Sequence, residues 1–364
     1  MDTLPGRVSS RVPAFLFASW LAACMATGDR ETGRADDELQ RFEFARPAMG
    51  TLFRVLLYAP DEACAAAAAE AAFARIAALD RVLSDYDPES ELVRLGARSD
   101  EAAPTPPITL SPELFFVLAA AQGFARASAG AFDVTVGPHV RLWRRARRQG
   151  ELPSAERLAA AARAVGFEKL ALEPHKQSAR LLARGMRLDL GGIAKGYALD
   201  QALAELSGRA LPRALVVGGG EMRAGAAPPG ESGWRVELVG FETAIGSEPR
   251  AILWLAHAAL ATSGDFEQYL ELGGSRYSHI LDPRTGAPLT ERRLVSVLAP
   301  DGLTADALAT ALSVLGPGPG LALAARFPGV AARLLVLGEG GAEEFRSAGF
   351  PPLSCADPCA PPSP

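Results

Sequence analysis

Residues 277–286, YSHILDPRTG, form the stretch around which the rest of this chain is organised. His279 within it is one of only four histidines in the sequence. Asp282 and Pro283 favour the start of a turn, and Gly286 supplies the backbone freedom that closes it. The stretch therefore predicts an imidazole placed directly before a tight turn.

The segments that follow predict a strand and a helix. Residues 294–299 are apolar and partly β-branched, which indicates a buried strand, and Thr304 is a candidate N-cap for a helix rich in alanine and leucine. Asp306 and Thr310 are four residues apart, so a helix projects them from one face. Their carboxylate and hydroxyl are the hard oxygen donors that magnesium prefers. The alternative is that Asp306 only stabilises the helix N-terminus and Thr310 only packs.

The composition indicates a protein with a substantial core. The chain has 364 residues, of which 49% are apolar, and a net charge of −5 at pH 7. This negative balance, without interleaved basic and aromatic residues, argues against a nucleic-acid-binding protein. One basic cluster is interpreted as a solvated helix end: Arg141, Arg144, Arg145, Arg147 and Arg148.

The N-terminus has the features of an export signal. Arg7 and Arg11 precede the apolar residues 12–23, a run too short to span a bilayer permanently. Small residues then lead to Cys24, which resembles a bacterial lipoprotein signal in which residues 1–23 are removed and the cysteine is lipidated. The expected location is therefore the bacterial cell envelope, with a lipid anchor on the periplasmic side of the membrane.

A plain signal peptide cut near Ala23 or Ala26 is the alternative. In either case the polar residues 24–41 predict a flexible tether, and the folded domain is expected over residues 42–350. A proline-rich tail follows at residues 351–364.

The cysteines give weaker indications. Cys64 lies in an alanine-rich segment and is expected in the core. Cys355 and Cys359 lie in the tail, where an exported protein could bond them, but their spacing supports neither a disulfide nor a metal site strongly.

Predicted strands and helices do not alternate regularly, which favours an α+β fold over a doubly wound sheet. Helices are expected over residues 63–83, 111–128 and 153–165, and a polar turn over residues 261–266. The core face of the first helix is expected to include Ala67, Ala71, Ala74, Ala78 and Val82.

Two glycine-rich segments stand out. Residues 191–196 separate a predicted strand, 187–190, from a predicted helix, 197–206, and such a turn exposes backbone amides to an anion. The glycines at 218–220 do not form a dinucleotide-binding fingerprint, because Arg223 occupies its last glycine position. They are interpreted as a strand end that approaches another segment closely.

Taken together, these segments resemble the FAD:protein FMN transferase (ApbE) family over about residues 42 to 335. The resemblance rests on six blocks in the same order: Met49-Gly50-Thr51 and residues 84–92, 130–138, 189–200, 261–265 and 277–310.

The resemblance implies a single large α+β domain of mixed sheets and packed helices. It implies that His279 is the catalytic base and that Asp306, Thr310 and the main chain near Gly192 hold Mg²⁺. The residues implied to line the FAD site are Met49, Tyr86, Ala131, Phe132, Asp133, Asp189, Lys195 and Ile280.

The implied activity moves FMN from FAD to a Ser or Thr hydroxyl of an acceptor flavoprotein, a subunit of a membrane redox complex, and releases AMP. Two alternatives are an FAD diphosphatase that yields FMN and AMP, and a lipoprotein that binds FAD without turnover. Four positions depart from the family pattern and concern the flavin pocket and acceptor choice: Gly96, His139, Val217 and Glu221.

Overall fold

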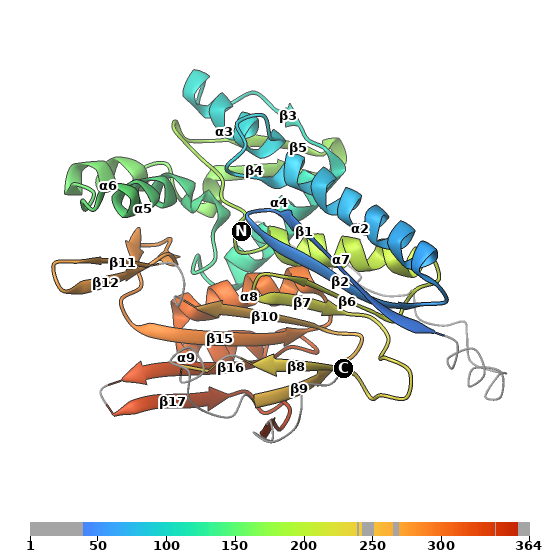
Figure 1. The fold of residues 1–364 in the computed structure, drawn as a ribbon. Coiled ribbons are helices and arrows are strands. Elements are labelled where there is room, and N and C mark those ends of the chain that lie inside the picture. Colours follow the sequence, from blue (N-terminus) through green and yellow to red (C-terminus); the bar gives the residue numbers. More distant parts are fainter. Residues whose placement is uncertain (1–38, 239, 242–250, 265–268, 339, 356–364) are drawn as a thin grey trace, which may run out of the picture. The chain divides into compact units, whose positions relative to one another are not determined.

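The computed structural model describes residues 39–355, with gaps at residues 239, 242–250, 265–268 and 339 (Figure 1). The described residues belong to one unit that begins at Leu39, close to the expected start of the domain. The proposed signal peptide, Cys24, most of the tether, and Cys359 lie outside the described residues. None of the helices in the described part of the chain is long and apolar enough to cross a membrane.

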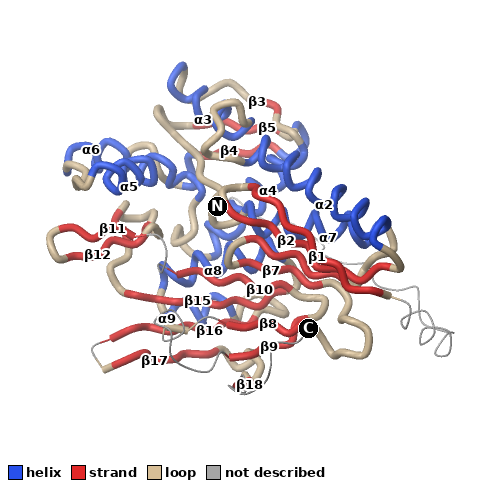
Figure 2. Tube along the Cα trace, viewed as in Figure 1, coloured by secondary structure: helices blue, strands red, loops and turns tan. Residues whose placement is uncertain are grey.

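An eight-stranded sheet forms the centre of this unit (Figure 2). Each of its strands pairs antiparallel with its neighbours. In sheet order its strands are β1 (Gln40–Ala48), β2 (Thr51–Ala59), β6 (Ala214–Gly218), β7 (Glu221–Ala224), β10 (Ala259–Gly264), β15 (Arg292–Ala299), β16 (Ala331–Gly338) and β17 (Gly341–Arg346). The predicted strand at residues 294–299 is confirmed as part of β15.

Both faces of the central sheet are covered, because successive side chains of a strand point to opposite faces. On β2, Val55 and Leu57 join the main core with helices α2 (Glu62–Leu83), α7 (Ala194–Gly208) and α8 (Gly302–Leu315). Leu56 points the other way, into a second core formed with β8 (Trp234–Leu238) and β9 (Ala251–Leu255). Helices thus cover one face and a small sheet covers the other, which confirms the α+β class.

Helices α7 and α8 are joined at their N-terminal ends. The Asp200 carboxylate on α7 accepts hydrogen bonds from the backbone N–H groups of Gly302 at 2.7 Å and Leu303 at 2.9 Å. Gly196 faces the Gly302 carbonyl so closely that a Cβ atom would collide with it. The N-cap of α8 is Asp301, whose side chain accepts from the Thr304 N–H. The prediction that Thr304 caps this helix was therefore wrong by one turn.

The remaining elements surround this core. The helices are α3 (Glu91–Glu101), α4 (Pro112–Ala127), α5 (Gly137–Gln149), α6 (Ala155–Ala162), α9 (Pro317–Ala324) and the short η1 (Val134–Val136), η2 (Phe167–Lys169) and η3 (Pro174–Lys176). The strands are β3 (Ile108–Thr109), β4 (Leu170–Glu173), β5 (Ser178–Leu181), β11 (Tyr269–Leu272), β12 (Ser275–Ser278), β13 (Leu281–Asp282), β14 (Ala287–Pro288) and β18 (Ser354–Cys355), which pairs with β9.

Helix α2 occupies the predicted segment, but its core face differs from the predicted one. Its buried residues include Phe73, Ile76 and Leu79, whereas none of the five predicted core positions is buried. In an alanine-rich helix the few large side chains decide which face packs against the core. Cys64 lies in the first turn and is exposed, so its expected place in the core was also wrong.

Other local predictions have mixed outcomes. Ser111 and Ser154 cap α4 and α6 close to the predicted helix starts. Residues 187–190 are not part of a sheet. Residues 261–264 continue strand β10 rather than forming a turn, because they pair with β15, and Asp265 lies outside the described residues.

Candidate active site

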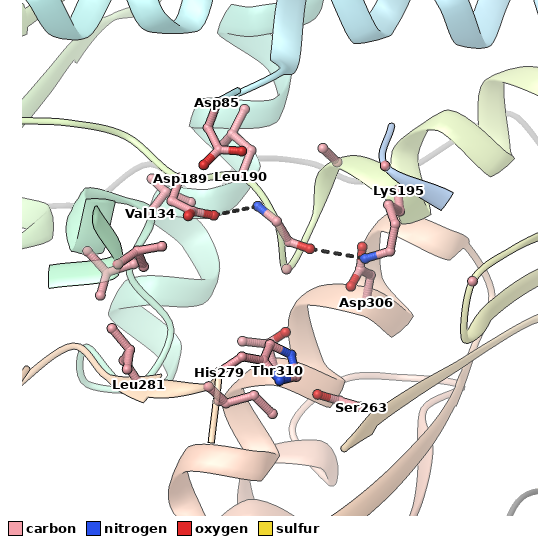
Figure 3. A pocket seen from close by; sticks show the side chains of 18 of the residues that line it. Asp85, Val134, Asp189, Leu190, Lys195, Ser263, His279, Leu281, Asp306 and Thr310 are labelled. Carbon is pink, nitrogen blue, oxygen red and sulfur yellow. Dashed lines mark hydrogen bonds between the residues drawn. The ribbon is translucent and has the colours of Figure 1, made fainter. Parts of the chain in front are cut away.

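A cavity of about 1510 Å³ opens between α5, the N-terminus of α7, α8 and the β11–β12 hairpin. It brings together segments that are far apart in sequence. Every residue predicted for the FAD site, the metal and the base lines it: Met49, Tyr86, Ala131, Phe132, Asp133, Asp189, Gly192, Lys195, His279, Ile280, Asp306 and Thr310. The close-up in Figure 3 shows several of these side chains converging.

The candidate metal position lies where the glycine-rich turn meets α8. Asp306 is only 3% exposed, and its Oδ2 accepts a hydrogen bond from the Gly196 N–H at 3.0 Å. Thr310 lies one turn further along α8, and a Cβ atom on Gly192 would be 2.5 Å from its Oγ1. A carboxylate, a hydroxyl and main chain are therefore packed together, and this donor set fits Mg²⁺ if water and phosphate oxygens complete it. The described residues hold no cluster of three or more His, Cys, Asp or Glu side chains placed for a metal.

Lys195 and Glu221 form a buried ion pair beside Asp306. Lys195 Nζ lies 3.0 Å from Glu221 Oε1 and donates to the Gly191 carbonyl at 3.2 Å. Burial raises the pKa of Glu221 to about 7, against the opposing effect of the Lys195 charge. Burial alone would lower the pKa of Lys195, but the carboxylates of Asp306 and Glu221 outweigh it and raise that pKa, so Lys195 is a cation in the cavity.

The glycines before Glu221 explain how its side chain reaches Lys195. A Cβ atom on Gly220 would lie 2.7 Å from the Thr262 carbonyl oxygen. The predicted close approach at this strand end is thus confirmed, and it aims Glu221 into the cavity. Its Oε2 is buried without a hydrogen-bond partner. Sequence analysis noted Glu221 as a departure from the family pattern but did not predict this ion pair.

A second ionic cluster joins α5 to the turn after α2. Arg144 pairs with Asp85 and, at 3.0 Å, with Asp189 Oδ2. Its guanidinium also lies 4.2 Å from the centre of the Tyr86 ring, which is 73% exposed. Burial and then the Asp189 charge raise the pKa of Asp85 to about 6. The interpretation of the arginine cluster as a solvated helix end was therefore wrong for Arg144. Arg147 is half-buried and lines the cavity.

His279 follows strand β12 directly and is exposed at the cavity. His279 lines the same cavity as Thr310, and Asp306 lies one turn from Thr310 on α8; all three are labelled in Figure 3. The turn after it has the predicted form, because the Gly286 N–H donates to the Asp282 carbonyl at 2.8 Å and Gly286 has φ +73°.

Helix α5 fixes this turn from outside. Trp143 Nε1 donates to the Gly286 carbonyl at 2.9 Å, and its ring stacks on Tyr277 with the centroids 5.5 Å apart. Trp143 therefore contacts the chain both before His279, at Tyr277, and after it, at Gly286.

Two further predicted residues have clear structural roles. Asp133 is buried, and its Oδ1 accepts from the Thr135 N–H at 2.8 Å and from the Thr135 hydroxyl at 2.7 Å; burial raises its pKa. Met49 and Gly50 form the two-residue loop between β1 and β2, with φ of 47° and 73°. A methionine in this left-handed conformation is unusual, and such strain is concentrated at functional sites.

The lining of the cavity is acidic. Seven carboxylates line it against three permanent cations, Arg144, Arg147 and Lys195. Two of the carboxylates form ion pairs with Arg144 and one with Lys195. An α+β domain whose cavity combines a glycine-rich turn at a helix N-terminus, a lysine cation and an exposed imidazole has the features of an enzyme active site.

Comparison with known proteins agrees with an enzymatic role. The model of the ApbE family matches residues 49–334, and the chain belongs to this family. The FAD:protein FMN transferase of Treponema pallidum is 34% identical over 317 residues, which cover 82% of this chain and 84% of that protein. The FAD:protein FMN transferase of Haemophilus influenzae is 31% identical over 327 residues, which cover 87% of this chain and 90% of that protein.

Solved structures show the same fold. The flavin transferase ApbE from Vibrio cholerae superimposes with a TM-score of 0.76 at 28% identity, over 86% of this chain and 98% of that one. The apo form of the Pseudomonas stutzeri flavinyl transferase ApbE superimposes with a TM-score of 0.73 at 31% identity, over 85% of this chain and 95% of that one. The family resemblance inferred from the six sequence blocks is confirmed.

Proposed function

We propose that this chain transfers FMN from FAD to a Ser or Thr hydroxyl of an acceptor flavoprotein and releases AMP, with the help of Mg²⁺. The observation that carries the proposal is that His279, Asp306 and Thr310 line one cavity, which also presents Lys195 and the glycine-rich turn. Family membership supports it, since the relatives are named FAD:protein FMN transferases.

The proposed reaction breaks the diphosphate of FAD. The acceptor hydroxyl oxygen attacks the phosphorus of the FMN half and forms a phosphoester. The bond from that phosphorus to the bridging oxygen breaks, and its electron pair leaves with AMP. His279 would take the hydroxyl proton, because an imidazole accepts protons near neutral pH and is within reach of the cavity.

The charge of the cavity supports a role for a cation. Seven carboxylates against three permanent cations would repel a diphosphate. A divalent ion held by Asp306, Thr310 and the main chain of Gly192 would offset this repulsion and neutralise charge that develops on the leaving phosphate. Lys195 would add a fixed positive charge, and the glycine-rich turn would present backbone N–H groups at the start of α7.

Hydrolysis of FAD to FMN and AMP is a second candidate at the same site. His279 is exposed, so a water molecule could reach it and take the place of the acceptor hydroxyl. FAD binding without turnover is a third possibility.

The proposed setting is the cell envelope. Residues 12–24 support export and lipidation at Cys24, and the anchored enzyme would act on a flavoprotein subunit of a membrane redox complex.

A single experiment separates these candidates. The full chain is incubated with FAD, Mg²⁺ and a candidate acceptor flavoprotein, and the mass of the acceptor is followed. A mass gain of one FMN that requires Mg²⁺ supports transfer. Free FMN and AMP with unmodified acceptor would support hydrolysis, and intact bound FAD would support simple binding. The same mixture with EDTA is the control for the metal.

A further inference from the structure

Helix α5 carries an unusual concentration of positive charge. Its 13 residues, GPHVRLWRRARRQ, contain five arginines and no acidic residue. Arg144 is the arginine of this helix that forms ion pairs. Within the described part of the chain, the other four have no ion-pair partner: Arg141, Arg145, Arg147 and Arg148.

The arginines occupy distinct faces of the helix. His139 and Ala146 are buried and mark the face toward the core. Val140, Trp143, Arg144 and Arg147 recur at helical spacing and line the cavity. Three exposed arginines follow one another at i, i+4 and i+7 on the outer side, and we call them the arginine stripe: Arg141, Arg145 and Arg148.

This arrangement has an energetic cost to the helix. Like charges three or four residues apart repel each other by a few tenths of a kcal/mol per pair. The helix dipole compensates only near the C-terminal end, where Arg148 lies. Because no anion of the described chain neutralises the stripe, an external anion would relieve the repulsion.

Helix α5 also forms one wall of the opening beside His279. Its Trp143 stacks on Tyr277, two residues before His279, and its Arg144 lies over Tyr86. Figure 1 shows α5 beside the β11–β12 hairpin, and both elements contribute residues to the cavity. A polypeptide that brings a hydroxyl to His279 therefore passes close to α5.

We propose that the arginine stripe binds an acidic segment of the acceptor polypeptide, close in sequence to the residue that receives FMN. This proposal rests on the proposed function and specifies its second substrate. Arg147, on the cavity side of the helix, continues the positive charge from the stripe toward the reaction centre. FAD is not the ligand of the stripe, because the three stripe residues do not line the cavity.

An anionic membrane surface would also be attracted to the stripe. The acidic peptide is favoured because Arg147 continues the positive charge from the stripe to the lining of the cavity, where a polypeptide can follow and a bilayer cannot. The experiment includes the membrane as one of its outcomes.

The test uses two labelled synthetic peptides of equal length that contain one Thr. In one the Thr is flanked by Asp and Glu, and in the other these are replaced by Asn and Gln. Binding to the full chain is measured by fluorescence anisotropy at low salt and at 150 mM salt, and hydrogen exchange locates the contact. The stripe variant is R141Q/R145Q/R148Q, and its charge-matched control is R81Q/R184Q/R209Q, at three exposed arginines outside α5.

We expect the acidic peptide to bind wild type and control alike and the stripe variant about tenfold more weakly, with protection at α5 and the β11–β12 hairpin. Equal binding to all three proteins, or protection elsewhere, would overturn the proposal. So would selective loss of binding to phosphatidylglycerol vesicles with no difference for the peptide.

Binding of FAD, followed by its fluorescence, is expected to be unchanged in the stripe variant. A wild-type chain that binds the acidic peptide at α5 but never transfers FMN would count against the proposed function while supporting the stripe as a peptide-binding surface.

Discussion

The main chain of Gly192 lies directly against the side chain of Thr310, so that a Cβ atom would be 2.5 Å from the hydroxyl oxygen. The main chain of the glycine-rich turn at the start of α7 thereby packs directly against a side chain of the third turn of α8. The proposed Mg²⁺ position depends on this contact, because two of its three protein donors come from these two residues.

Gly192→Ala is expected to push Thr310 away and to lower FMN transfer at least about tenfold, with a loss of about 1–3 kcal/mol in the free energy of unfolding. Transfer rates over a Mg²⁺ titration and chemical denaturation measure the two effects. Gly208→Ala, at the end of α7, is the control because its added Cβ meets no atom within 4 Å. Normal Mg²⁺ dependence in Gly192→Ala would remove this residue from the metal site.

His279→Ala is expected to lower transfer by a factor of about 100 or more, because no other group replaces the proton acceptor. FAD binding should persist, since the imidazole is exposed and the groups proposed to bind the phosphates, Lys195 and the glycine-rich turn, are unchanged. Acceptor mass and FAD fluorescence test this. Loss of FAD binding in the variant would contradict the assignment of His279 as a base.

Asp306→Asn separates the charge of this residue from its structural role. The amide oxygen can still accept the Gly196 N–H, so the fold should remain, but a charged Mg²⁺ ligand is lost. We expect an increase of at least about tenfold in the Mg²⁺ concentration for half-maximal transfer and a reduced rate. An unchanged Mg²⁺ titration would exclude Asp306 as a ligand.

Asp85 gives the folded chain a pH dependence whose sign can be worked out. Its pKa is about 6 in the folded chain, above the ordinary value for an aspartate, so the folded state holds the proton more tightly than the unfolded state. Stability due to this group is therefore present at low pH and lost as pH rises from about 4 to 6.

Asp85→Asn removes this contribution. The difference in unfolding free energy, wild type minus variant, should fall by up to about 3 kcal/mol over that pH range. Urea denaturation at several pH values measures it. A difference that rises with pH would show that pairing with Arg144, rather than burial, dominates at Asp85.

Cys24→Ala is expected to release the protein from membranes, since a lipid chain on this residue is the proposed anchor. Fractionation of cells without detergent, with the released protein detected by antibody, checks this. A variant that stays with the membranes would refute anchoring through Cys24.

The residues predicted for the site line one cavity in the structure, which includes His279, Asp306 and Thr310. Helical spacing could place Asp306 and Thr310 on one face, but the role of His279 and the FAD-site residues followed only from the family resemblance. The N-cap of α8 was missed because Asp301 and Thr304 are both good caps, and their backbone conformation decides between them.

Tertiary partners could not be predicted in the same way. The pairing of Lys195 with Glu221, and of Arg144 with Asp85 and Asp189, joins segments whose approach depends on the whole sheet. The glycine run before Glu221 indicated that the chain approaches another segment closely there, but it did not indicate which segment. The sequence of the arginine cluster on α5 also does not indicate which of its arginines line the cavity.

The bond from Asp200 to the start of α8 has a consequence for how this enzyme family can diversify. It connects α7 and α8, which carry Lys195, Asp306 and Thr310, into one block, whereas α5 and the β11–β12 hairpin line another side of the cavity. Changes on that wall that keep Arg144 and the segment around His279 should alter which polypeptide is accepted and leave the α7–α8 block intact.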